Sequence, residues 1–142
     1  MKDIRKRVVI EADIELVWSF VTQSDKIAMW LMPNDFQAKK GHAFTMQCQV
    51  KDGSQGHIEA QVLELDPPQW LVYSWLIAEP RLQTQVSIRL SEVRGGTELN
   101  LVHSGWEPLG EDPEGLRELH DSIWSQLLGE KLRGLICGGG RS

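Results

Sequence analysis

Cysteine is scarce, and the positions of the two cysteines exclude two common ways of stabilising a small domain. Cys48 and Cys137 lie far apart in a chain of 142 residues. Neither forms part of a CxxC pair or has a histidine at metal-ligand spacing, so the sequence indicates neither a disulfide framework nor a zinc site. We therefore expect a reduced, cytoplasmic environment and no metal or other cofactor.

Long apolar runs are also missing. The segment from Met1 to Trp30 contains no apolar stretch of the kind found in signal peptides. No later stretch approaches the roughly 18 apolar residues of a membrane-spanning helix. We therefore expect no membrane span, in agreement with a cytoplasmic location.

The chain lacks an excess of positive charge. It has 15 Lys and Arg against 20 Asp and Glu, which gives a net charge of -5. This balance disfavours general electrostatic binding to nucleic acid or anionic lipid. A local basic cluster between Lys2 and Arg7 is flanked by Asp3 and Glu11, which is typical of a solvated chain end. We expect no nucleic-acid partner.

The aromatic residues are unusual in kind, because the chain has six Trp but only three Phe and one Tyr. Otherwise the composition, 41% hydrophobic and 25% charged, is that of an ordinary globular domain. A chain of this length buries roughly 70% of the surface that its unfolded form exposes, which is enough for a core with a cavity in it. With no internal repeat and no long linker, residues 1–142 are expected to form a single domain.

The N-terminal part is predicted to form a strand and two short helices. The β-branched end of residues 4–10 favours a strand. Asp13 is expected to cap a helix on which Ile14, Val17, Trp18 and Val21 share one apolar stripe. Ser24 is expected to cap a second helical turn that continues to residue 30 and ends before residue 33, a proline.

From about residue 35 the hydrophobic period changes to two and stays there for most of the chain, which predicts an antiparallel meander. The predicted strands cover residues 44–50, 58–62, 70–77, 84–90 and 98–103. Turns are expected at residues 52–54, 66–68, 78–80 and 94–96.

The last element is predicted to be one long helix over residues 113–136, stopped by the three glycines at 138–140. Ten residues are expected to mark its buried side: Leu116, Leu119, His120, Ile123, Trp124, Leu127, Leu128, Lys131, Leu132 and Leu135. The order of elements places the chain in the α+β class.

A twisted meander of six to seven strands curls, and its concave face must be covered because it is apolar. The C-terminal helix is expected to be the only cover that is long enough. A curved sheet wrapped around one helix tends to enclose an elongated apolar cavity, which suits a planar or chain-like hydrophobic ligand. The candidate ligand-binding residues are Phe44, Met46, Tyr73, Trp75, Thr84, Val86, Ile88, His103, Trp106, His120, Trp124 and Leu128. If the cavity is filled, the same residues are core.

The sequence resembles the START-like (SRPBCC) superfamily, and within it the family of homologues of the activator of heat-shock protein 90 ATPase. The resemblance extends over nearly the whole chain and rests on the order and spacing of short pieces: Val17 and Trp18, Met29 and Trp30, Leu63 to Pro68, Leu71 to Trp75, Gly95 to Leu99, His103 to Trp106, and His120 with Trp124 to Leu128. It implies a helix-grip fold, in which a curved antiparallel sheet wraps around the long C-terminal helix.

The resemblance implies several functions. One is non-catalytic binding of a lipid-like or planar aromatic molecule, another is co-chaperone work on a heat-shock protein 90 ATPase, and a third is polyketide cyclisation. A chaperone partner and a homodimer therefore stay open beside the small-molecule ligand.

The residues themselves favour a binding protein over an enzyme, since no nucleophile motif and no inward carboxylate is recognisable. His103 and His120 lie on faces that are otherwise apolar. They either orient a ligand or are core or rim histidines satisfied by backbone carbonyls. Trp30, Met32 and Trp106 are expected at loops, where they either form an entrance to the cavity or plug the ends of the sheet. Trp75 and Trp124 are predicted to face each other between sheet and helix.

Overall fold

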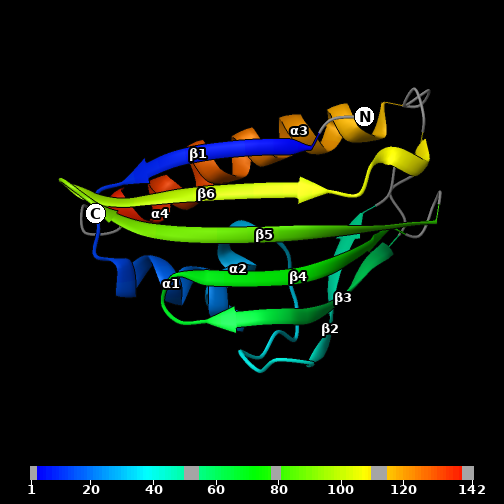
Figure 1. Ribbon diagram of the computed structural model, residues 1–142, viewed down its shortest axis with the longest axis horizontal. Helices are drawn as coiled ribbons and strands as arrows, with labels where there is room; N and C mark the ends of the chain where they lie inside the picture. Colours follow the sequence, from blue (N-terminus) through cyan, green and yellow to red (C-terminus); the bar gives the residue numbers. More distant parts are fainter. Residues whose placement is uncertain (1–2, 50–54, 78–80, 110–114, 139–142) are drawn as a thin grey trace.

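A computed structural model describes residues 3–49, 55–77, 81–109 and 115–138, and Figure 1 shows its architecture. The first part of the chain contains strand β1 and two helices, followed by five strands. Their bounds are β1 (Ile4–Ile10), α1 (Ile14–Thr22), α2 (Ser24–Trp30), β2 (Ala43–Gln49), β3 (Gln55–Asp66), β4 (Trp70–Ile77), β5 (Leu82–Val93) and β6 (Gly96–Ser104).

The strands form one sheet in the order β1-β6-β5-β4-β3-β2, and every neighbouring pair is antiparallel. Beyond β2, Asn34 forms an isolated bridge with Met46, and the backbone N–H of Gln47 donates to the carbonyl of Pro33. The predicted meander and the α+β class are confirmed. The prediction of six to seven strands corresponds to six strands and this short edge segment.

The alternation that predicted the strands also orients their side chains. Along β5, Leu82, Thr84, Val86, Ile88 and Leu90 are buried, while the residues between them are more exposed. A register shift between Val62 and Glu64 interrupts the pairing of β3 with β4. Such bulges bend a strand and increase its twist, which helps this sheet to curve.

Helices cover one face of the sheet. The C-terminal helix consists of α3 (Leu116–Gln126), a π-helical segment η2 (Leu127–Leu132) and α4 (Arg133–Gly138). In Figure 1 it runs beside β1 and β6, and α1 and α2 occupy the rest of the same face. Helix α1 contacts β5 and β6, and α2 contacts η2. The expectation that the last helix alone covers the sheet is therefore wrong, because the two short helices share that role.

The expected helix caps are only partly present. Asp13 occupies the N-cap position of α1, but its side chain makes no capping hydrogen bond. Helix α2 starts at Ser24 itself, with Gln23 at its N-cap. The hydroxyl of Ser24 donates instead to the carbonyl of Asn34, so tertiary contact with the loop replaces the predicted cap.

The C-terminal helix differs from its prediction in two ways. Within the described residues it begins at Leu116 and continues to Gly138, past the predicted end. Leu119 and Ile123 are 49% and 39% exposed, so they do not belong to its buried side. No helix in the described ranges combines the length and the hydropathy needed to cross a bilayer. The turns predicted at residues 52–54 and 78–80 lie outside the described residues.

Candidate functional site

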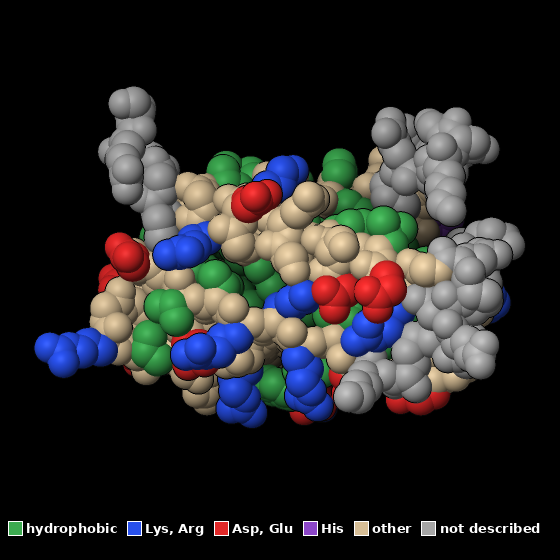
Figure 2. Space-filling model, turned by 90° about the horizontal axis from the view of Figure 1, so that it is seen from above, with side chains coloured by type: hydrophobic (Ala, Val, Ile, Leu, Met, Phe, Trp, Pro, Cys, Tyr) green, Lys and Arg blue, Asp and Glu red, His purple; other side chains and the backbone are tan. Residues whose placement is uncertain are grey.

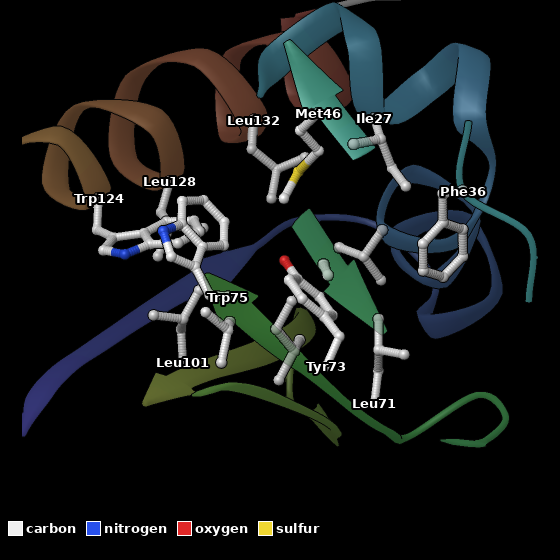
Figure 3. Packing of buried hydrophobic residues seen from close by; sticks show 14 of the residues in the cluster. Ile27, Phe36, Met46, Leu71, Tyr73, Trp75, Leu101, Trp124, Leu128 and Leu132 are labelled. Carbon is white, nitrogen blue, oxygen red and sulfur yellow. The ribbon is translucent and has the colours of Figure 1, made fainter. Parts of the chain in front are cut away.

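Five aromatic rings meet between the sheet and the C-terminal helix. Trp75 of β4 lies 5.6 Å from Trp124 of α3 and 5.3 Å from His103 of β6, measured between ring centroids. Trp106, which follows β6, lies 4.6 Å from His103 and 5.1 Å from His120 of α3. The predicted facing of Trp75 and Trp124 is confirmed. We call these residues the aromatic cluster: Trp75, His103, Trp106, His120 and Trp124 (Figure 3 shows the two facing tryptophans).

His103 is fully buried and both of its ring nitrogens are engaged. The indole N–H of Trp124 donates to His103 Nδ1 at 3.0 Å, so Nδ1 is an acceptor and the ring proton resides on Nε2. Nε2 lies 2.7 Å from the hydroxyl of Thr84, which donates in turn to the carbonyl of Trp75 at 2.8 Å. Every proton in this chain of hydrogen bonds has one position, and the imidazole in it is neutral.

Burial is the main reason that the His103 imidazole stays neutral. Burial and, to a smaller extent, the nearby His120 together lower the pKa of His103 to about 2. His103 is thus a satisfied core histidine, the second of the two alternatives left open by the sequence, although its partners are side chains and not backbone carbonyls. It offers no free nitrogen for proton transfer to a substrate, so His103 cannot serve as an acid–base group of the kind that a polyketide cyclase would need.

The segment after β6 folds back onto the sheet. Gly105 has a φ of +101°, and a Cβ there would lie 3.1 Å from Thr84 Cα, so this turn favours glycine. Trp106 then packs on His103 and donates its indole N–H to the His103 carbonyl at 2.9 Å. Trp106 and Trp30 are both fully buried, and Trp30 donates to the carbonyl of Phe20. Both tryptophans act as plugs and not as an exposed entrance.

A small void lies at the other side of the covered face, beneath α1 and α2. Its volume is about 10 Å³, room for roughly one water molecule. Tyr73 forms part of its wall, and in Figure 3 its hydroxyl points from the sheet toward Met46 and Leu132. Burial raises the pKa of Tyr73, so the phenol stays neutral. The full lining is Val21, Ile27, Trp30, Leu31, Phe36, Phe44, Met46, Tyr73 and Ile88.

Among the described residues, no elongated open cavity separates the sheet from the C-terminal helix. The side chains expected to form its wall lie in one packed core instead, because Trp124, Leu128 and Leu132 of the helix fill the space above the sheet. The candidate residues fall into two groups in this core. Phe44, Met46, Tyr73 and Ile88 border the void, whereas the aromatic cluster lies beside Thr84, and Val86 pairs with both Tyr73 and His103 between the two groups.

Sequence reasoning missed the contribution of the N-terminal helices to the void. Val21, Ile27, Leu31 and Phe36 line it although they were not candidates. The periodicity correctly predicted that Val21 is buried, but it did not indicate which part of the sheet Val21 packs against. Phe36 had the weaker signal of a lone aromatic residue before a strand.

His120 lies at the margin of the aromatic cluster and is partly buried. Its Nδ1 lies 2.9 Å from the carbonyl of Leu116, one turn earlier in α3, so this nitrogen donates to the backbone as a rim histidine would. Among the described residues, no three His, Cys, Asp or Glu side chains gather closely enough to hold a metal ion.

Most of the chain matches a known protein family. Residues 11–136 match the family described as activator of Hsp90 ATPase homolog 1-like protein. The chain belongs to this family. The match includes the whole aromatic cluster and the void, and it confirms the resemblance on which the fold expectation was based.

Solved structures of similar size share the fold of this family member. A solution structure of a Bacillus halodurans protein is 32% identical, with 96% of this chain and 97% of that chain covered and a TM-score of 0.78. A Mesorhizobium loti protein is 27% identical over 94% of this chain and 96% of its own, with a TM-score of 0.76. The Aha1 dimer from Colwellia psychrerythraea is 20% identical, covers 99% of each chain and has a TM-score of 0.77, which shows a common fold. None of the curated proteins matches the chain significantly.

Proposed function

We propose that this protein is a non-catalytic binding domain for a hydrophobic small molecule, lipid-like or planar and aromatic, which inserts between the sheet and the C-terminal helix. The observation that supports this proposal is the aromatic cluster. Its rings come from both sides of that interface, and Trp75 and Trp124 lie 5.6 Å apart across it. These two rings are tilted by 54° to each other, and a flat ligand would insert between them when the helix moves outward.

The construction of the C-terminal helix supports such a movement. Its middle is the π-helical segment η2, and π-helical turns are often found at functional sites. Gly129 and Gly134 lie in its interior, and each weakens a helix by roughly 0.5–1 kcal/mol relative to alanine. Neither glycine is there to avoid a clash, since a Cβ at either position meets nothing within 4 Å. The C-terminal helix is therefore less stable than a helix of the same length without these glycines.

Burial of the ligand contributes free energy that offsets part of the cost of this opening. A ligand that buries about 300 Å² of apolar surface gains roughly 7 kcal/mol. Trp124, Leu128 and Leu132 would pack against the ligand after the helix moves, so little of their own burial is lost.

Native mass spectrometry of gently purified protein, combined with a thermal-shift screen of lipids and planar aromatics, tests the proposal. A ligand present at about 100 times its Kd adds about 2.7 kcal/mol of stability, which corresponds to a Tm increase of roughly 5–10 °C in a domain of this size. A copurified small molecule or a shift of this size from one ligand class is the expected result.

Apolar compounds also adhere to exposed apolar side chains on a helix surface, so the screen needs a matched control. The double variant Leu119→Ser, Ile123→Ser removes the two exposed apolar side chains of α3 and leaves the aromatic cluster intact. It should show the same Tm increase as the wild type. The proposal fails if no ligand class shifts the Tm and no copurified mass is found, or if the double variant loses the shift.

A further inference from the structure

One donor in the aromatic cluster has no acceptor. Trp75 is 4% exposed, and its indole Nε1–H is buried without a hydrogen-bond partner within the described part of the chain. The indole N–H groups of Trp30, Trp106 and Trp124 are all satisfied, at 2.8, 2.9 and 3.0 Å. A buried donor without an acceptor is destabilising, so the exception at Trp75 needs a physical explanation.

Two polar side chains beside Trp75, those of Thr84 and His103, already have partners. The Thr84 hydroxyl donates to the Trp75 carbonyl and accepts from His103 Nε2. His103 Nδ1 accepts from Trp124. In Figure 3 the Trp75 indole rises from β4 toward Leu128, into the interface that the proposed ligand would enter. An acceptor for this N–H is therefore best supplied by a bound molecule.

The surroundings of this donor favour an uncharged molecule. The buried polar residues among those described are Thr22, Thr84, Thr97 and His103, and no Lys or Arg is among them. The imidazole of His103 is neutral, and Tyr73, whose ring stacks 6.5 Å from Trp75, is a neutral phenol. A carboxylate placed here would lose its hydration without gaining a cation, which is strongly unfavourable.

We propose that Trp75 Nε1–H determines ligand specificity by donating to an acceptor oxygen on an uncharged planar molecule, such as an aromatic ketone. This assignment rests on the proposed function and narrows it to one chemical class. Tyr73 and Trp124 supply ring faces for the aromatic part of the ligand, whereas Trp75 supplies the single directional contact. Pure hydrocarbons lack the acceptor, and carboxylates carry a charge that the site does not neutralise.

Three probes with the same tricyclic ring test the assignment: fluorene, 9-fluorenone and fluorene-9-carboxylate. Their affinities are measured by calorimetry for the wild type and for Trp75→Phe, which removes the donor and keeps an aromatic ring. In the wild type the ketone should bind about tenfold more tightly than the hydrocarbon, as one hydrogen bond allows, and the carboxylate should bind most weakly. The Trp75→Phe variant should bind fluorenone and fluorene with about equal affinity, because the donor is gone and an aromatic ring remains.

Trp70→Phe is the matched control, because Trp70 lies on the same strand and its indole N–H already donates to Glu64. It should keep the wild-type affinities for all three probes. If Trp75→Phe does not fold, the ¹⁵N–¹H NMR signal of the Trp75 indole in the wild type decides the question. It should shift downfield with fluorenone and far less with fluorene.

The outcomes separate this assignment from the proposed function. Equal affinities of the wild type for fluorene and fluorenone, or a ketone preference that survives in Trp75→Phe, would overturn the role of Trp75 and leave the binding function intact. Binding of none of the three probes would overturn the assignment and count against the binding function itself.

Discussion

His103 illustrates how a residue that looks catalytic in a sequence becomes structural in a fold. Its two ring nitrogens connect α3, through Trp124, to β5, through Thr84. Protonation of Nδ1 would place a second proton where the Trp124 N–H already points, so the hydrogen bond between sheet and helix would be lost. The residue therefore holds the cover onto the sheet only in its neutral form.

Acid should destabilise the protein through His103. The pKa of His103 is about 2 in the folded protein and near 6.5 in the unfolded chain, so the unfolded chain binds more protons between these values. Stability is fully present above pH 6.5 and decreases as the pH falls below it, by up to about 1.4 kcal/mol per pH unit. Denaturant unfolding at pH 7 and pH 5 measures this difference.

Two measurements isolate His103 from the other titrating groups. The variant His103→Gln lacks the titrating group, so its unfolding free energy should vary less between pH 7 and pH 5 than that of the wild type. In the folded wild type, the NMR signal of the His103 ring should not titrate between pH 7 and pH 5. A ring that titrates near pH 6 would contradict the hydrogen-bond assignment.

For single residues, the alternation of apolar and polar positions predicted burial correctly, but it did not predict the hydrogen-bond partners of the side chains. The period of two placed Tyr73, Trp75 and His103 correctly on the buried face. It could not show that Thr84 and Trp124 satisfy His103 while Trp75 stays without a partner, because those contacts join three elements.

Among the elements, the C-terminal helix also shows which features could be predicted from the sequence and which could not. Its fully buried residues are Trp124, Leu128 and Leu132, spaced by four. Since an α-helix has 3.6 residues per turn, side chains spaced by four drift around it by about 40° at each step. The wider π-helical segment at Leu127–Leu132 reduces this drift and keeps the three residues on the sheet. The spacing was visible in the sequence, but a broader stripe was predicted from it.

Replacing the interior glycines of this helix should strengthen the cover. Gly129→Ala with Gly134→Ala adds two Cβ atoms that meet nothing within 4 Å, so we expect about 1–2 kcal/mol of added stability. Chemical denaturation measures this gain. If the helix opens to admit ligand, association of fluorenone should also become slower in stopped-flow fluorescence. A more stable variant with unchanged association would show that opening of this helix does not limit entry.

At the scale of the whole molecule, both edges of the sheet carry features that limit pairing with another sheet. At one edge, Arg5 and Arg7 of β1 are charged and exposed, and Arg7 pairs with Glu98 of β6. At the other, the segment around Asn34 covers part of β2. Charges and short covering segments limit edge-to-edge association of sheets. Figure 2 shows Lys and Arg interspersed with acidic and apolar groups on one face, without a field of a single sign.

Hydrogen exchange should divide this molecule into a slow sheet and a faster cover. Backbone amides of β4, β5 and β6, each strand being paired on both sides, should exchange most slowly. Amides of η2 and α4 should exchange faster, because the π-helical segment and the glycines weaken that part of the helix. Saturation with fluorenone should slow exchange in the helix more than in the sheet. Equal protection of the helix and the central strands without ligand would argue against a movable cover.

The sequence by itself determined the class of the fold, the strand pattern, the buried faces and the family resemblance, because period and turn chemistry are local properties of a chain. Only the tertiary structure decided that α1 and α2 share the cover, that His103 is locked neutral and that the expected cavity is a packed core with a void of about 10 Å³. The physical reason is that these features depend on how side chains from distant segments fill one space, and hydrophobic pattern specifies which residues are buried but not which atoms they meet.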